Sequence, residues 1–171
     1  MDTTTYLAKL LSVKTGPGGV PFIKKRYLEI IQNNILVDHP ELIFHIAVSA
    51  NEPVIVEYIL DRYELDPNSN SIAETSQITH SPYMNAMMFE CYDVINIFLQ
   101  RHLFPDNWYL MFLFNKIYET SVFQQIISDY GNYISLQIEE INKLLTMYEG
   151  NTKITEFLKT KKQNYETQNR R

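Results

Sequence analysis

The chain has 171 residues, 45% of them hydrophobic and 13% aromatic, and a formal net charge of −5. This length can bury a substantial core, whereas the acidic balance argues against a nucleic-acid-binding module, which usually has a basic surface. The single cysteine, Cys91, excludes an internal disulfide framework. No segment has the apolar length of a membrane span, and the N-terminus lacks a secretory pattern. We therefore expect a cytoplasmic protein, and the cytoplasm can be that of a host cell if the protein is delivered there.

The N-terminal part of the chain predicts two helices separated by an irregular segment. Apolar residues recur at helical spacing over about 3–13 and about 22–33. Between them, "TGPGGVP" is the one stretch rich in glycine and proline. It lacks the spacing of a phosphate-binding loop, so we expect a flexible connector.

Two helices joined by a very short turn are predicted next. The residues "DHPE" indicate a helix start with Asp38 as the N-cap, and this helix is expected to end near Ala50. "NEP" follows at once and indicates a further helix, with Asn51 as its N-cap, that ends near Tyr63.

The rest of the chain continues as short helices. Ser81 is expected to cap the next one, and Gly131 is a candidate C-cap further on. The remaining helices are expected at about 81–90, 92–103, 107–118, 120–131, 135–148 and 152–162. No segment shows the alternation typical of strands, so we predict an all-α chain with a single helical-repeat domain over 1–165 and a disordered polar tail, 166–171.

Short paired helices suggest an internal repeat, and two segments align without gaps. They are "FHIAVSANEPVIVEYILDRYELDPN" and "YMNAMMFECYDVINIFLQRHLFPDN", which place Ala47 over Ala86, 39 residues apart. The aliphatic pairs of the second helix also coincide. A weaker third copy, which keeps only the hydrophobic pattern, follows and ends at Gly131.

These residues resemble the ankyrin repeat, which reads T-P-L-H-x-A-A, a tight turn, aliphatic pairs and then G-A-D-x-N. In "FHIAV", His45 and Ala47 fall in register with that pattern, and "LDPN" resembles its end. In the second copy Ser81-Pro82 keep the T-P position. The small residue allows close stacking of helices, and the aliphatic pairs fill the core between repeats.

The chain also departs from the ankyrin pattern. Leu42-Ile43 replace T-P in the first copy, Met84 replaces the histidine in the second, and the hairpin glycine is absent from both. The resemblance therefore implies a short ankyrin-like solenoid with divergent terminal helices. A generic α-solenoid and an irregular helical bundle are the alternatives.

The resemblance implies a non-enzymatic domain that binds another protein through its loop tips and the exposed side of each first helix. Carried over to this chain, the protein-binding residues are Ser49, Ala50, Asn68, Asn70, Met88, Phe89, Trp108 and Tyr109. Trp108 has a second interpretation, in which it only packs a helix start onto the core. The Asn-, Ile- and Tyr-rich composition resembles that of proteins from AT-rich genomes. Small divergent ankyrin-like proteins of that kind often belong to large DNA viruses or intracellular bacteria, where they engage host factors.

Residue patterns for catalysis or metal binding are not evident. The four histidines form no metal-spaced pair, and His45 is expected to have a structural role. No base is apparent near Cys91. We predict no catalytic, cofactor-binding or metal-binding residue. Two alternatives stay open, a small helical enzyme that uses Cys91 and a self-associating structural subunit, and the sequence does not give the oligomeric state.

Overall fold

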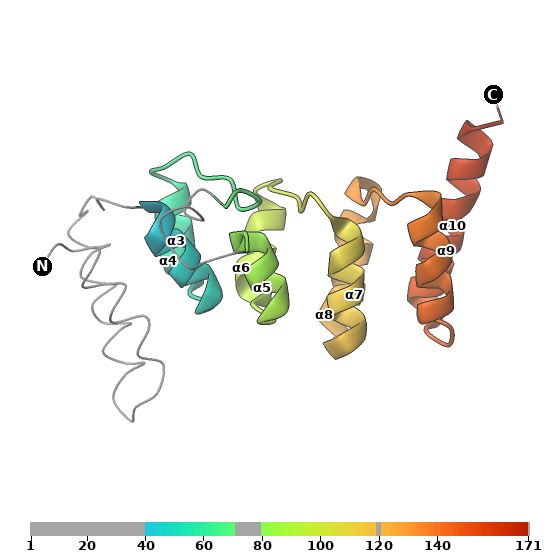
Figure 1. Cartoon of the computed structure of the whole chain (residues 1–171), viewed down its shortest axis with the longest axis horizontal. Coiled ribbons are helices and arrows are strands. Elements are labelled where there is room, and N and C mark those ends of the chain that lie inside the picture. The colour runs from blue at the N-terminus through green and yellow to red at the C-terminus, as the bar shows by residue number, and fades with distance from the viewer. Residues whose placement is uncertain (1–39, 71–79, 119–120, 171) are drawn as a thin grey trace, which may run out of the picture. The chain divides into compact units, whose positions relative to one another are not determined.

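The computed structural model describes residues 40–70, 80–118 and 121–170 (Figure 1). Over these ranges it contains eight α-helices, one 3-10 turn and no β-strand, which confirms the all-α prediction. The two helices and the glycine-rich connector expected before residue 34 lie outside the described residues.

The helices agree with the expected elements in number and order over the described ranges. With the labels of Figure 1 they are α3 (Pro40–Ser49), α4 (Pro53–Leu60), α5 (Pro82–Met88), α6 (Tyr92–Gln100), α7 (Trp108–Tyr118), α8 (Ser121–Tyr130), α9 (Ile138–Met147) and α10 (Thr152–Gln168), with the 3-10 turn η1 at Gly131–Tyr133. The predicted cap of α5 is confirmed, because the Ser81 hydroxyl accepts a hydrogen bond from the Met84 N–H at 3.2 Å.

Two expectations near the C-terminus were wrong. Gly131 opens η1 and does not end α8 in the left-handed conformation. Helix α10 continues past Lys162 to Gln168, and neither proline nor glycine follows Lys162 to end it earlier. The tail predicted to be disordered from residue 166 is therefore helical as far as Gln168.

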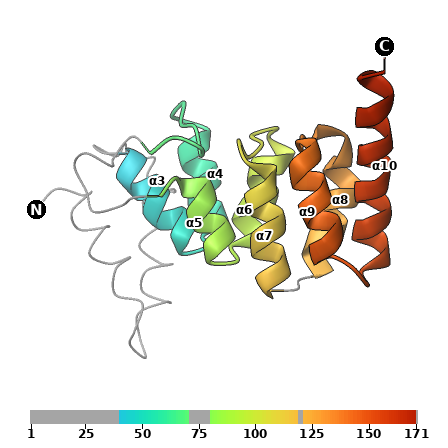
Figure 2. The ribbon, with the colours of Figure 1, turned by 45° about the vertical axis from the view of Figure 1, so that its right-hand side comes forward.

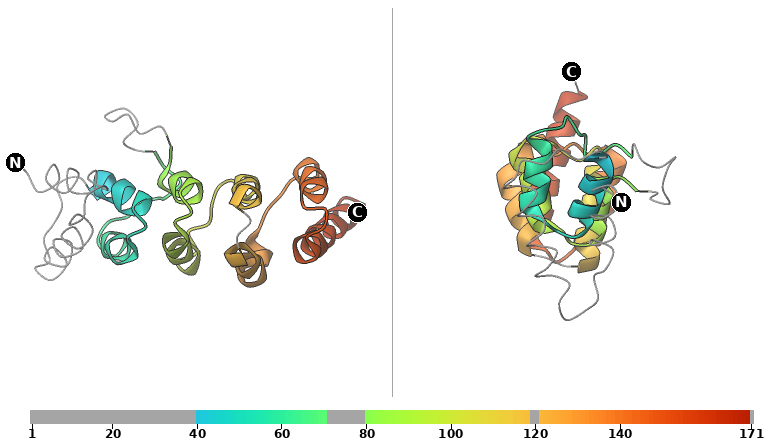
Figure 3. Two further views of the ribbon diagram at one scale, coloured as in Figure 1. Left: turned by 90° about the horizontal axis from the view of Figure 1, so that it is seen from below. Right: turned by 90° about the vertical axis from the view of Figure 1, so that its left-hand side faces the viewer.

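The contacts divide the described residues into two compact units, which separate between Leu103 and Phe104. The single domain predicted over residues 1–165 is thus divided into two groups by its contacts. In the first unit, α3 packs beside α5 and α4 beside α6, so the four helices form two layers (Figure 3, left). In the second unit, α9 packs against α7 and α10, and α8 packs against α10 (Figure 2).

The core of the first unit joins its two helix pairs. Ala47 and Ala86, the small residues of the alignment, are both fully buried, where a larger side chain would separate the helices. Phe98 of α6 is also fully buried, and its ring centroid lies 5.9 Å from that of Phe44 in α3 and 5.0 Å from that of Tyr83 in α5. These ring contacts are at distances typical of favourable aromatic pairs.

The two helical hairpins of the first unit turn in the same way. In the first hairpin the Glu52 N–H donates to the Ala47 carbonyl at 3.0 Å. In the second, 39 residues further on, the Cys91 N–H donates to the Ala86 carbonyl at 2.8 Å. The residues that the sequence alignment matches therefore close both turns with equivalent backbone hydrogen bonds.

Asn51 has a different role from the predicted N-cap of α4. Its backbone is left-handed, with φ of 52°, so Glu52 takes the N-cap position of α4 without a side-chain hydrogen bond. The Asn51 amide oxygen instead accepts from the Val94 N–H at 3.3 Å, and its amide nitrogen donates to the Asp93 carboxylate at 2.9 Å. Asn51 thus caps the first turn of α6 and ties the two hairpins together.

Glu90 occupies the position equivalent to Asn51 and is also left-handed, with φ of 55°. Asparagine and glycine adopt the left-handed conformation more readily than glutamate does. For glutamate this conformation costs about 1 kcal/mol. We expect Glu90→Gly to raise the free energy of unfolding by about 1 kcal/mol, measured by urea denaturation. Glu90→Ala keeps the backbone strain, so we expect it to change the free energy of unfolding by less than about 0.5 kcal/mol. Equal effects of the two substitutions would show that the strain is absent.

The second unit is organised around Tyr148, which is buried between α9 and α10. Its hydroxyl donates to the Phe112 carbonyl at 2.6 Å and accepts from the Asn115 amide at 2.9 Å. The Phe112 ring meets the Phe123 ring edge-on, with 4.8 Å between centroids. Paired polar groups and aromatic contacts therefore join α7, α8 and α9 in one core.

Candidate functional site

The turns of the two hairpins, residues 49–52 and 88–93, lie next to each other in the first unit, and we call them the hairpin edge. Besides the bonds made by Asn51, the Cys91 thiol lies 3.8 Å from the Ser49 carbonyl. These contacts fix one turn against the other. Four of the sequence-predicted contact residues are brought together on this edge, namely Ser49, Ala50, Met88 and Phe89.

Phe89 is the most exposed large apolar side chain of the described part of the first unit. It follows the last residue of α5 and is 59% exposed, whereas Ala50 occupies the equivalent position in the first hairpin. Phenylalanine is normally buried, and Phe and Met are enriched at interfaces. The hairpin edge therefore presents an aromatic side chain on a turn that hydrogen bonds hold in place.

The hairpin edge is acidic. Residues 40–103 contain nine acidic side chains, two arginines and no lysine, a formal charge of −7. Both arginines, Arg62 and Arg101, follow the C-terminal ends of α4 and α6, which are the ends away from the hairpin edge. The edge itself carries Glu52, Glu90 and Asp93, so its field attracts a positively charged surface.

Asn68 and Asn70 lie in the segment that follows α4, at the ends of the helices away from the hairpin edge. The Asp66 carboxylate accepts from the Asn68 N–H at 2.9 Å, and the Pro67 carbonyl accepts from the Tyr83 N–H at 2.8 Å. The start of this loop is therefore anchored to α5. The residues that follow, 71–79, lie outside the described residues.

Trp108 and Tyr109 belong to the second unit, at the start of α7. Trp108 is only 4% exposed and its ring centroid lies 6.1 Å from that of Phe104. This burial favours the interpretation in which Trp108 packs the helix start onto the core, so Trp108 is not available as a surface anchor. Tyr109 is half-buried.

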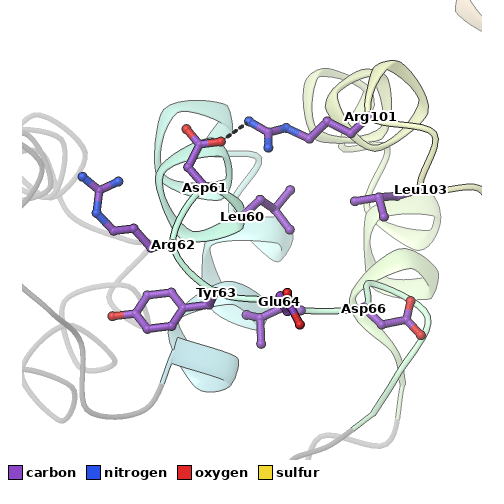
Figure 4. A pocket seen from close by; sticks show the side chains of 9 residues that line it. Leu60, Asp61, Arg62, Tyr63, Glu64, Asp66, Arg101 and Leu103 are labelled. Atoms are coloured by element: carbon purple, nitrogen blue, oxygen red, sulfur yellow. Dashed lines mark hydrogen bonds and ion pairs between the residues drawn. The ribbon is translucent and has the colours of Figure 1, made fainter.

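A groove that the sequence did not indicate lies between the end of α4 and the end of α6 (Figure 4). It has a volume of about 690 Å³, and Leu60 and Leu103 face each other across it (Figure 4). Arg101 and Asp61 form an ion pair of 2.8 Å at its rim. The two partners are 40 residues apart in sequence, which is why only the paired arrangement of the hairpins reveals the groove.

Arg62, which also lines the groove, is held in place by Tyr58 of the preceding helix, α4. The Arg62 guanidinium lies 3.7 Å from the centroid of the Tyr58 ring and donates to the Tyr58 carbonyl at 3.3 Å. A guanidinium over a tyrosine ring is an attractive cation–π arrangement. The groove thus combines apolar walls with fixed charges, but no nucleophile and base lie together in it.

Cys91 is placed as a structural residue. Its side chain is 2% exposed, and its thiol lies near the carbonyls of Ser49 and Phe89, at 3.8 and 3.7 Å. A thiol buried in this way is poorly accessible to a substrate. Within the described ranges, no three His, Cys, Asp or Glu side chains are arranged to hold a metal ion.

No protein-family model, curated protein or solved structure matches the chain. In the part of the chain that the structure describes, every helix is too short or too polar to cross a bilayer.

Proposed function

We propose that the chain is a non-enzymatic protein-interaction module that binds a basic surface of a protein partner through the hairpin edge. The observation that carries this proposal is Phe89, 59% exposed on a turn that is fixed by hydrogen bonds and that also contains Glu90 and Asp93. A rigid aromatic side chain loses little conformational entropy on binding and is a common anchor of protein interfaces.

The charges around Phe89 determine which partners the edge selects. Glu52, Glu90 and Asp93 repel acidic surfaces and accelerate the approach of basic ones. Arg62 and Arg101, the two arginines of the described part of the first unit, lie at the other ends of the helices.

We also propose that α3–α6 are two ankyrin-like repeats of a short solenoid with divergent ends. The gapless alignment, the equivalent hydrogen bonds of the hairpins and the left-handed backbone at Asn51 and Glu90 support this proposal. The resemblance to small ankyrin-like proteins of large DNA viruses and intracellular bacteria suggests a host protein in the cytoplasm as the partner, with the chain acting as a viral or bacterial effector.

The proposal predicts that Phe89→Ala reduces capture of the partner from a eukaryotic cytoplasmic extract by about tenfold or more, because truncation of a central anchor costs 2 kcal/mol or more. Quantitative pull-down with immobilised chain measures this loss. The matched control is Ile117→Ala, which removes a side chain that is 68% exposed in the second unit and is expected to retain every partner. Equal capture by wild type and Phe89→Ala would contradict the proposal.

Two further variants distinguish the alternatives. Cys91→Ser is expected to leave capture unchanged, whereas an enzyme that uses Cys91 would lose its activity. If the partner is a second copy of the chain, light scattering will detect a dimer that Phe89→Ala converts to a monomer.

A further inference from the structure

A second cavity lies in the first unit at the ends of the helices away from the hairpin edge. It has a volume of about 260 Å³ and is formed by the N-terminal half of α3, the segment after α4 and the start of α5. Among the described residues its polar lining consists of His45, Ser69 and three carboxylates, with no lysine or arginine. The cavity is several times larger than the roughly 30 Å³ that one water molecule takes up in the liquid.

His45 lines this cavity with an imidazole that has no hydrogen-bond partner among the described residues. The residue is 2% exposed, and neither ring nitrogen is paired. A buried polar group without a partner costs about 1–3 kcal/mol, which a bound donor would recover.

The protonation state of His45 determines what kind of group it would bind. Burial lowers the pKa of His45 to about 4, so the ring is neutral at pH 7. A neutral imidazole has one nitrogen that accepts a hydrogen bond. His45 therefore offers an acceptor to a ligand, and it adds no positive charge to the cavity.

The rest of the lining attracts a cation. Glu41, Glu64 and Asp66 carry three negative charges around one small space, and one oxygen of Asp66 is already used by the Asn68 N–H. Like charges that line one cavity repel each other, and a positive group among them relieves that repulsion. An organic cation with several directed donors matches carboxylates that line the same cavity as a neutral imidazole acceptor.

We propose that this cavity binds a primary alkylammonium group, of the kind that ends a lysine side chain. The ammonium group has three donors, which the His45 nitrogen and the carboxylates can accept. Phe44, Leu65 and Pro82 also line the cavity and offer apolar surface to the methylene stem. The site is separate from the hairpin edge, so its failure would leave the proposed function untouched.

The test follows the imidazole Cε1–H signal of His45 by NMR during titration with N-acetyl-lysine methylamide, the signal being identified by its absence in His45→Gln. The neutral analogue N-acetyl-norleucine methylamide has the same stem without the ammonium group. We expect a saturable shift of the His45 signal with the lysine probe alone. The absence of a saturable shift, or equal shifts with both probes, would overturn the proposal.

Variants of the full chain test the role of the carboxylates. Glu64→Gln combined with Asp66→Asn is expected to weaken binding of the lysine probe at least tenfold, because charge-assisted hydrogen bonds are the strong ones. Glu57→Gln removes an exposed carboxylate that does not line the cavity and is expected to leave the affinity unchanged. Equal affinity of the double variant and wild type would also overturn the proposal.

The ammonium group can come from a protein side chain or from a free amine. Titration with n-butylamine distinguishes these sources, since tighter binding of the lysine probe assigns the cavity to a peptide-borne lysine and tighter binding of butylamine assigns it to a free amine. Either result supports the ammonium site.

Discussion

Replacing Phe98 by alanine is expected to lower the free energy of unfolding by about 3–5 kcal/mol, the range typical of a large aromatic side chain removed from a core. Phe98 is fully buried, and its ring contacts Phe44 and Tyr83, which belong to two other helices. The substitution therefore leaves a cavity where both helix pairs of the first unit meet. Urea or guanidinium denaturation followed by circular dichroism measures the loss.

The matched control for this prediction is the same chemical change at Phe89. That side chain is 59% exposed, and Phe89→Ala is expected to change the free energy of unfolding by less than about 0.5 kcal/mol. Similar losses for the two variants would mean that the core of the first unit is not where we place it. A stable Phe89→Ala also ensures that its loss of binding is not a loss of folding.

Acidification from pH 7 to pH 4 is expected to lower the free energy of unfolding by about 3 kcal/mol through His45 alone. The pKa of His45 is about 4 in the folded chain, below the ordinary value of 6.5, because burial penalises the charged ring. Between these two values the unfolded chain takes up the proton first. The contribution to stability is therefore complete above pH 6.5 and is lost as the pH falls towards 4.

Comparison of variants isolates this contribution from that of the carboxylates Glu41, Glu64 and Asp66, which line the same cavity. Urea denaturation at a series of pH values is expected to show a shallower pH dependence for His45→Gln than for wild type. His102→Gln, which alters an exposed histidine, is expected to retain the wild-type slope. Equal losses of stability for His45→Gln and wild type between pH 6.5 and 4 would contradict the assignment of His45 as a buried neutral histidine.

Much of the fold of the described residues could be predicted, because short-range signals determine it. Helical spacing of apolar residues located the helices, and Ser81 capped α5 as its hydroxyl and the following proline indicated. The role of Asn51 could not be predicted, because its side chain bonds to α6, about 40 residues away. The extension of α10 was missed because its last turns are polar on every side and have no apolar stripe.

The candidate site was predicted in part. The alignment of the two hairpins placed Ala50 and Phe89 at equivalent positions of the turns, and the structure brings these turns together. Trp108 was placed on a surface because aromatic type alone does not distinguish an interface anchor from a core residue. The cavity at His45 depends on contacts between α3, a loop and α5, and no local pattern signals it.

Photo-cross-linking from position 89 tests the proposed interaction most directly. A chain with Phe89→p-benzoylphenylalanine is irradiated in a eukaryotic cytoplasmic extract, beside a chain with the same residue at the exposed position Ile117 of the second unit. Binding through the hairpin edge predicts a discrete adduct from position 89 that is absent from position 117. No adduct from position 89, or the same adducts from both positions, would contradict it.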